Sequence, residues 1–251
     1  MKIGIIGFGN LGRALASGLI KSGYDAGNIF VCDNSEQALT LAAGDFRMHA
    51  SDDVNTTIGA SEVIFLTVKS YVFEKLAEKI DRQRLGEKTI VSFMAGVPLE
   101  RLRALIGDVE LIRAMPSLAI AVCDGVIGYT KAPPRIAGLF GKLGYAFETD
   151  PADIERVMAF SSCGLGFAAY LIDAFASAGE TMGFSKETSV KIAALTFKNA
   201  VQRGSFKETV TAVATPGGAT EQGITHMDES CVYDIISAAV AKAYKKMNEG
   251  S

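Results

Sequence analysis

A glycine motif near the beginning of the chain constrains its fold more than any other feature. Gly7, Gly9 and Gly12 have the spacing GxGxxG, directly after the apolar run from Lys2 to Ile6. The segment from Leu11 to Ile20 then carries leucines at helical spacing. After a strand and at the start of a helix, such glycines allow a tight turn, a close approach to a pyrophosphate, and close packing of helix on strand. We therefore expect a dinucleotide phosphate at the helix N-terminus, with a ligand-free glycine turn as the alternative.

The first half of the chain continues to alternate between strands and helices. Short runs rich in β-branched and aromatic residues predict strands at Asn28 to Cys32, Glu62 to Val68, Lys88 to Phe93, Val109 to Arg113 and Gly125 to Thr130. Helical patterns follow Ser35, a predicted N-cap, to about Ala43, and run from Tyr71 to Ile80. Parallel strands need crossover connections, so this alternation predicts an α/β fold, with a Rossmann-like, doubly wound parallel sheet in residues 1–150.

The pattern changes at Pro151, and residues 151–251 are expected to form an all-helical domain. The predicted helices are Ile154 to Phe160, Phe167 to Met182, Lys186 to Gln202 and Ser230 to Lys246. Small residues that permit close helix packing occur at Ala174, Ala176, Ala178 and Gly179. A helical block of this size that is apolar around much of its circumference often completes its core with a second subunit, so we expect a dimerisation domain. The tail from Asn248 to Ser251 is expected to fray.

Composition narrows the class of protein further. Hydrophobic residues make up 49% and charged residues 21% of the 251 residues, which is typical of a globular chain. The net charge is -3 and no dense basic cluster occurs, so a nucleic-acid partner is not expected. The four cysteines form no CxxC pair and there are two histidines, so we expect reduced thiols and no metal site. Because no signal-peptide core and no uncharged run of about 20 apolar residues is found, a cytoplasmic protein without a membrane partner is expected.

An acidic residue and two strand ends extend the expected dinucleotide site. Asp33 ends the second predicted strand, about 20 residues beyond the fingerprint, where a carboxylate can accept from the adenosine ribose and repel a 2′-phosphate. This favours NAD over NADP, and the alternative is that Asp33 only begins the following turn. Ligands of open α/β sheets bind at the carboxyl ends of strands, so Thr67 to Ser70 and Ser92 to Gly96 are candidates for the nicotinamide side. Lys69 is alternatively an ordinary surface lysine.

A second chemical segment interrupts the helical half. Residues Thr211 to Gly223 read TAVATPGGATEQG, and a helix interior does not tolerate Pro216 followed by two glycines. A helix restarting near Thr220 would leave the N–H groups of Gly218, Ala219 and Thr220 unpaired, an arrangement that suits a carboxylate. The alternative is an ordinary capped loop between helices.

Together these motifs resemble the pyrroline-5-carboxylate reductase family over essentially the whole chain. The glycine fingerprint, Val68-Lys69, SFMAG from Ser92, RAMP from Arg113 and ATPGGAT from Ala214 occur in the family's order and spacing. The resemblance implies a Rossmann domain, a helical dimerisation domain in dimers or assemblies of dimers, and NAD(P)H-dependent reduction of 1-pyrroline-5-carboxylate to L-proline.

The resemblance also implies functional residues. The dinucleotide contacts would be Ile6, Gly7, Phe8, Gly9, Asn10, Leu11, Asp33, Thr67, Val68, Lys69, Ser70, Phe93, Met94 and Ala95. The substrate would be bound by Thr215, Gly218, Ala219 and Thr220. Thr220 would be the catalytic residue, with its hydroxyl near the ring nitrogen.

The sequence departs from the family at several positions. Ser70 and Ser117 replace the usual proline and asparagine after VK and RxMP, and SSCGLGF from Ser161 replaces SGSGPAY. Where the family often has an asparagine for the adenosine ribose, this chain has Val54, next to Asn55. Two further hypotheses therefore remain: a reductase of a related cyclic imine or keto acid, and a non-catalytic protein that binds a dinucleotide.

Overall fold

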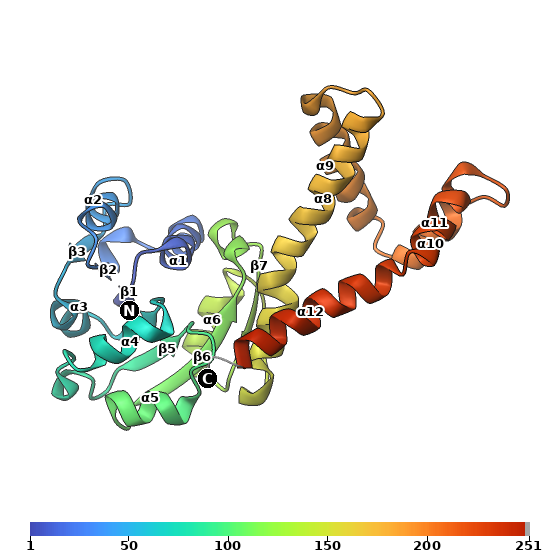
Figure 1. Ribbon diagram of the computed structural model, residues 1–251. Helices are drawn as coiled ribbons and strands as arrows, with labels where there is room; N and C mark the ends of the chain where they lie inside the picture. Colours follow the sequence, from blue (N-terminus) through green and yellow to red (C-terminus); the bar gives the residue numbers. More distant parts are fainter. Residues whose placement is uncertain (249–251) are drawn as a thin grey trace. The chain divides into compact units, whose positions relative to one another are not determined.

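The structure is a computed structural model that describes residues 1–248 (Figure 1). It divides the chain into two compact units, Met1–Ser162 together with the chain from Tyr244 onward, and Cys163–Ala243. Asn248 is the last residue of the final helix, and the expected fraying of residues 249–251 lies outside the described residues.

The first unit is built on an eight-stranded sheet. Its strands are β1 (Ile3–Ile6), β2 (Ile29–Cys32), β3 (His49–Ser51), β4 (Val63–Leu66), β5 (Thr89–Ser92), β6 (Glu110–Pro116), β7 (Gly125–Tyr129) and β8 (Gly144–Glu148). They are arranged in the order β3-β2-β1-β4-β5-β6-β7-β8. The chain order reverses between β1 and β4, so the sheet has the switch point of a doubly wound fold, as predicted.

One pair of strands departs from the predicted parallel arrangement. β7 runs antiparallel to β6, with Ala114 paired to Tyr129 and Pro116 to Ile127. The connection between these strands holds only a short 3₁₀ turn, Leu118–Val122, which is too short for the crossover that a parallel pair requires. The edge strands β3 and β8 were not predicted. β3 has three residues, and β8 is largely solvent-accessible, so neither forms a continuous buried apolar run.

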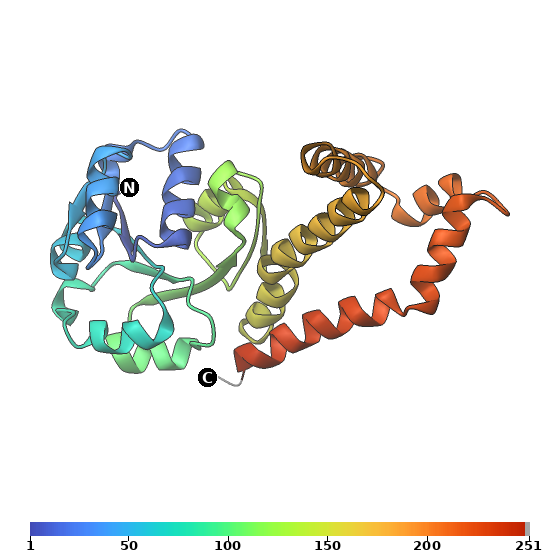
Figure 2. The ribbon, with the colours of Figure 1, turned by 45° about the horizontal axis from the view of Figure 1, so that its top comes forward.

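Helices cover both faces of the sheet (Figure 2). They are α1 (Asn10–Lys21), α2 (Glu36–Gly44), α3 (Val54–Ala60), α4 (Ser70–Ala77), α5 (Leu99–Ile106), α6 (Pro134–Gly141) and the short α7 (Ile154–Val157). Ile3 and Ile5 belong to the core with α1, α2 and α6, whereas Ile6 and Ile64 belong to the core with α3, α4 and α5. Successive residues of a strand point to opposite faces, so each buried strand supplies both cores. Ser35 caps α2 as predicted, because its hydroxyl accepts from the N–H of Ala38.

The chain enters the second unit through a π-helical turn at Met158–Ser162. The helices that follow are α8 (Cys163–Thr181), α9 (Lys186–Gln202), α10 (Phe206–Val213), α11 (Ala219–Glu229) and α12 (Val232–Asn248), whose last turn belongs to the first unit. Helices α8 and α9 pack against each other where their residues are small: Ala176 and Ala193 are buried, and a Cβ on Gly179 would lie 2.9 Å from Ser189 Oγ. Ala174 and Ala178 are exposed, so only part of the predicted small-residue stripe is used in this contact.

Many large apolar side chains of the helical unit are exposed in the single chain. They include Tyr170, Phe175, Met182, Phe184, Val201, Phe206, Tyr233 and Ile235. Within residues 1–248, one helical stretch, Pro151–Thr181, has the length and composition of a membrane span, and 6% of its most apolar window is buried. Exposed apolar side chains in such number are typical of a surface that packs against another protein surface.

Candidate functional site

The glycine turn after β1 has the geometry that its sequence predicts. Gly7 has a φ of +98°, and a Cβ there would lie 2.7 Å from Val68 Cγ1. A Cβ on Gly12 would lie 2.1 Å from the carbonyl oxygen of Gly7, so only glycine lets α1 pack this closely on the turn. In contrast, a Cβ on Gly9 would meet nothing within 4 Å. The turn therefore packs tightly on the protein side and has open space at Gly9, where a ligand could approach the backbone.

The N-terminus of α1 carries no group that would compete with an anion. Gly9 is its N-cap and makes no side-chain capping bond, and the first turn contains no acidic residue. The first helical hydrogen bond runs from the N–H of Arg13 to the carbonyl of Gly9, 2.9 Å. The N–H groups of Asn10, Leu11 and Gly12 precede that bond and have no helical acceptor. This end of a 12-residue helix, located at the switch point of the sheet, fits a dinucleotide pyrophosphate.

Two predicted contact residues support the glycine turn from inside. Asp33 Oδ2 accepts from the N–H of Phe8 at 2.6 Å, and Oδ1 accepts from the N–H of Ser35 at 2.9 Å. Asp33 thus begins the following turn, as in the alternative interpretation, and also anchors the fingerprint. The Thr67 hydroxyl donates to the carbonyl oxygens of Gly7 (2.6 Å) or Ile6 (3.0 Å). Phe8 is 2% exposed, so neither its ring nor its N–H is open to a ligand.

A cavity of about 420 Å³ lies next to the turn, against β1, β2 and α4. It is lined by Ile6, Gly7, Cys32, Asp33, Asn34, Asp52, Asp53, Val54, Val68, Tyr71, Val72, Lys75, Leu76 and Lys79. Its wall is partly apolar, and one edge carries three carboxylates. Burial first, and then the negative charges of Asp33, Asp53 and Asp52, raise the pKa of the Cys32 thiol to about 11. The adenosine half of a dinucleotide could occupy this cavity, whose lining carries two lysines, Lys75 and Lys79, besides the three aspartates.

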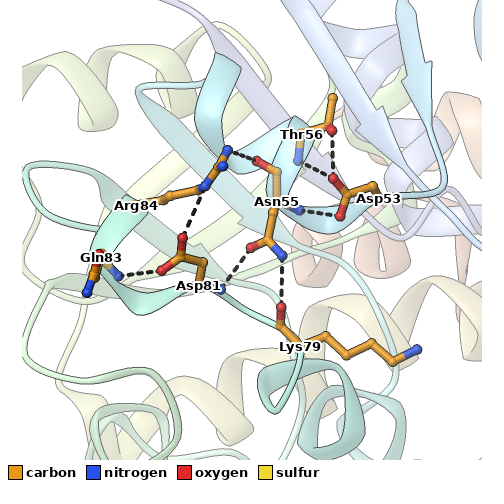
Figure 3. Close-up of polar contacts among 7 residues, drawn as sticks. All are labelled: Asp53, Asn55, Thr56, Lys79, Asp81, Gln83 and Arg84. Atoms are coloured by element: carbon orange, nitrogen blue, oxygen red, sulfur yellow. Dashed lines mark hydrogen bonds and ion pairs between the residues drawn. The ribbon is translucent and has the colours of Figure 1, made fainter.

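Asn55 does not replace the missing ribose asparagine (Figure 3). Its side-chain amide donates to the carbonyl of Lys79 at 2.9 Å, and its Oδ1 accepts from the N–H of Asp81 at 2.8 Å. Asp53 caps α3 next to it. The Thr56 hydroxyl donates to Asp53 Oδ2 at 2.6 Å and lowers the pKa of Asp53 most, and the N–H groups of Asn55 and Thr56, which also donate to this carboxylate, lower it further. Asn55 therefore joins α3 to the turn after α4, whereas Val54 lines the cavity.

The remaining predicted cofactor residues lie after the next two strands. Val68 lines the cavity, Lys69 and Ser70 are exposed, and Lys69 is the N-cap of α4. Phe93 and Met94 follow β5, and their side chains are buried in the two cores. Because β1, β4 and β5 are parallel neighbours, all these segments lie at the same edge of the sheet. Because the side chains of Phe93 and Met94 are buried, this segment could contact a ligand only through its backbone.

The PGGAT segment forms a tight turn before α11 in the second unit. Gly217 has a φ of +73°, and a Cβ on Gly218 would lie 2.5 Å from Thr215 Oγ1. The N–H of Gly218 donates to the carbonyl of Thr215 at 2.8 Å, so the prediction of an unpaired N–H at Gly218 is wrong. A helix was expected to restart near Thr220, and α11 begins at Ala219, directly after its N-cap Gly218. Ala219 and Thr220 therefore present their N–H groups at the first turn, and both residues are exposed.

Glu221 modifies this turn in a way that the sequence analysis missed. Its carboxylate accepts from the N–H of Gly217 at 2.7 Å. A negative side chain in the first turn stabilises a helix, but it also reduces the positive potential available to a bound carboxylate. Asp52 and Asp53 were missed as well, because the three-residue strand before them was not predicted. The sequence contained a signal for these carboxylates in both cases: two aspartates follow each other in SDD from Ser51, and a glutamate directly follows the PGGAT segment.

The fold and the glycine turn define a Rossmann dinucleotide-binding protein with a helical C-terminal half. Residues 2–96 match the family model described as NADP oxidoreductase, coenzyme F420-dependent, and residues 151–250 match pyrroline-5-carboxylate reductase dimerisation. The pyrroline-5-carboxylate reductase of Aquifex aeolicus is 28% identical, with 98% of this chain and 97% of the relative covered. The enzyme of the same name from Methanosarcina acetivorans is 27% identical, with 99% and 97% covered.

A solved structure has the same fold along the whole chain. The pyrroline carboxylate reductase of Plasmodium falciparum with NADP bound superposes with a TM-score of 0.90 at 21% identity, covering 99% of this chain and 97% of that one. The chain thus resembles pyrroline-5-carboxylate reductases over nearly its full length, and its C-terminal part, residues 151–250, matches the model of their dimerisation domain.

Proposed function

We propose that this protein is an NAD(P)H-dependent oxidoreductase that reduces 1-pyrroline-5-carboxylate to L-proline. The observation that carries the proposal is the PGGAT turn, which exposes the N–H groups of Ala219 and Thr220 at the start of α11. Such a turn recognises a small carboxylate, and it occurs in the same chain as an open dinucleotide fingerprint. Relatives with this name match nearly the full length of the chain.

The proposed chemistry needs positioning more than acid catalysis. When bound, NAD(P)H supplies the hydride, and a cyclic imine accepts it readily once protonated. The N–H groups of Ala219 and Thr220 bind the substrate carboxylate. The Thr220 hydroxyl forms an oriented hydrogen bond with the ring nitrogen, and Thr215 fixes the turn beneath it. Because the substrate arrives as a good acceptor, this scheme requires no histidine or carboxylate pair.

The cofactor segments have separate roles in this proposal. The N–H groups of Asn10 and Leu11, with Gly9 leaving room, bind the pyrophosphate. The backbone of Phe93 to Ala95 supports the nicotinamide, next to Thr67 to Ser70. Asp33 accepts from the ribose hydroxyls with the lone pairs that its two backbone bonds leave free.

We further propose a preference for NADH over NADPH. Asp33, Asp52 and Asp53 line one edge of the adenosine cavity, and a 2′-phosphate would add negative charge there. Lys75 and Lys79 also line the cavity and offset part of this charge. The expected preference is therefore a ratio of affinities rather than exclusion of NADPH.

The two halves of the chain have different tasks in the proposed enzyme. Residues 1–150 bind the dinucleotide, and residues 151–251 dimerise and bind the substrate. The apolar surface of the helical unit supports packing against a second copy, in a homodimer or an assembly of dimers, rather than insertion in a membrane. The proposed setting is the cytoplasm.

A second candidate function is reduction of another cyclic imine. Glu221 favours it, because its carboxylate lies in the first turn of the helix that would bind the substrate carboxylate. Steady-state rates with 1-pyrroline-5-carboxylate, 1-pyrroline and a six-membered imine carboxylate would separate the two functions. A strong preference for either alternative ring would refute the first assignment, and binding of NADH without turnover of any imine would indicate a non-catalytic protein.

A further inference from the structure

Arg113, in the RAMP motif, is a buried charge that the proposed mechanism does not use. Its side chain is 3% exposed, and Nη2 lies 2.5 Å from Glu155 Oε1. Nη1 lies 3.4 Å from Glu155 Oε2, so the ion pair is bidentate. Glu155, on α7, is 11% exposed. Among the described residues, Arg113 Nε is buried without a hydrogen-bond partner.

This arginine lies where β6 changes its neighbour. Arg113 is the last residue of β6 paired with β5, opposite Ser92, and the next residue, Ala114, pairs with Tyr129 of β7. β5 ends at Ser92, and its chain leaves the sheet as the segment Phe93 to Ala95. The guanidinium bonds to this segment, because Nη2 lies 3.4 Å from the carbonyl oxygen of Met94. Arg113 therefore contacts the backbone that we assign to the nicotinamide.

Stability alone is a weak reason for such a pair. Removing two charges from water costs several kcal/mol per ion, and well-packed apolar residues of similar size often serve as well or better. The unpartnered Nε adds to this cost. Glu155 nevertheless orients the guanidinium through both of its carboxylate oxygens, and the backbone N–H of Arg113 donates to Thr130 Oγ1 at 3.0 Å, which anchors the strand that carries the side chain. A side chain oriented in this way on an anchored strand is expected of a group that must hold something else in place.

We propose that Arg113, oriented by Glu155, is a positioning residue that holds the Met94 carbonyl and thereby the segment that supports the nicotinamide. The inference rests on the proposed dinucleotide site and adds a residue pair to it. Through Glu155 the segment is linked to α7, the last α-helix before the chain enters the helical unit. The pair would thus align the reactive half of the cofactor while leaving the adenosine half unaffected.

The test compares two ligands that share the adenosine half. ADP-ribose binds the fingerprint and the adenosine cavity, whereas NADH also occupies the nicotinamide side. The double variant Arg113→Met/Glu155→Leu removes both charges together, so that neither remains buried alone. The matched control is Glu110→Gln/Arg135→Met, which removes an exposed ion pair, 45% and 57% accessible, that also involves β6. Measurements are the Kd of each ligand, the fluorescence enhancement of bound NADH, and the melting temperature.

In the double variant we expect ADP-ribose affinity within about twofold of wild type and NADH affinity about tenfold lower, the equivalent of about 1.4 kcal/mol. The fluorescence enhancement should fall as well, and the control should change none of these. Equal changes in both ligands, or none, would refute the positioning role. Imine reduction is not needed for these readouts, so failure of the proposed function would appear separately, as wild type that binds NADH without turnover.

Arg113→Lys provides a second variant if the double variant does not fold. A lysine keeps the charge beside Glu155, but its single nitrogen lacks the guanidinium fork that serves both Glu155 and the Met94 carbonyl. We expect the same selective loss of NADH affinity at a smaller amplitude, about threefold. With a substrate that turns over, the kinetic isotope effect of 4-deuterated NADH should also change. A lower melting temperature with unchanged NADH binding would contradict the proposal.

Discussion

Replacing Asp33 with asparagine is the most informative change to the cofactor site. The structure shows why serine, the smaller replacement, would change more than the charge. Asp33 accepts from Phe8 and Ser35, and a hydrogen bond to a charged acceptor contributes about 1.5 to 3 kcal/mol. Serine would lose both bonds and loosen the glycine turn for every dinucleotide. Asparagine removes the charge and keeps an acceptor for the N–H of Phe8, and it gives up only the second acceptor, which serves the N–H of Ser35.

The magnitude follows from charge and distance. A carboxylate about 5 Å from a phosphate charge costs about 1.7 kcal/mol at an effective dielectric constant of about 40. Removing it should improve NADPH binding about tenfold. Loss of the charged acceptor for the ribose hydroxyls should weaken NADH binding by a similar factor. The ratio of the two Kd values is therefore expected to move by about 100-fold toward NADPH.

The assay is titration of both reduced cofactors by fluorescence, for wild type and Asp33→Asn at one ionic strength. The control variant is Asp45→Asn, which removes an exposed aspartate after α2 that does not line the cavity. Asp33→Ser should move the ratio in the same direction with weaker binding of both cofactors. An unchanged ratio in Asp33→Asn would show that this carboxylate does not face the ribose.

Three further predictions concern other residues of the two units. Glu221→Gln should lower the KM for a carboxylate-bearing imine about two- to fivefold, because removing the negative charge restores the positive potential at the N-terminus of α11. The KM for the neutral 1-pyrroline should stay unchanged, and equal effects on both substrates would contradict this reasoning. Cys32, whose pKa is raised from 9.0 to about 11, should have about 100-fold less thiolate at pH 8 than an ordinary thiol, so peptide mapping after brief iodoacetamide treatment should find it unlabelled. Between pH 9 and 11 the unfolded chain loses the Cys32 proton whereas the folded chain keeps it, so the contribution of Cys32 to the free energy of unfolding should decline as pH rises through this range. Cys32→Ser should abolish this pH dependence. Asn55→Ala should lower the free energy of unfolding by about 1 to 3 kcal/mol without changing the Kd of NADH, and a weaker Kd at unchanged stability would instead place Asn55 at the ribose.

Strong local patterns made most of the first unit predictable. The fingerprint glycines have one steric solution between a strand and a helix, and buried parallel strands such as Val63–Leu66 are continuous apolar runs. The sequence therefore predicted the doubly wound sheet with α1, α2 and α4, whereas α3, α5 and α6 were not predicted. The predicted parallel direction of β7 was wrong, because the direction depends on the short turn before the strand rather than on the strand's own composition.

The candidate site was predictable in outline and less so in detail. Motif spacing located the fingerprint and the PGGAT turn, but partners distant in sequence decide which groups are free. The N–H of Phe8 is occupied by Asp33, and the N–H of Gly218 by Thr215. Asn55 is next to the position where the family often has its ribose asparagine, but its side-chain amide bonds to the turn after α4. Such assignments depend on tertiary contacts, which periodicity and motif spacing do not encode.

The central claim is tested most directly by oxidation of NADH and NADPH by the purified protein with 1-pyrroline-5-carboxylate, compared with Thr220→Ala. We expect wild-type turnover to form proline, with a higher rate for NADH at limiting cofactor. In Thr220→Ala, kcat should fall, because the oriented hydroxyl is lost, while NADH still binds. Wild type that binds NADH but leaves this substrate unchanged would contradict the assignment.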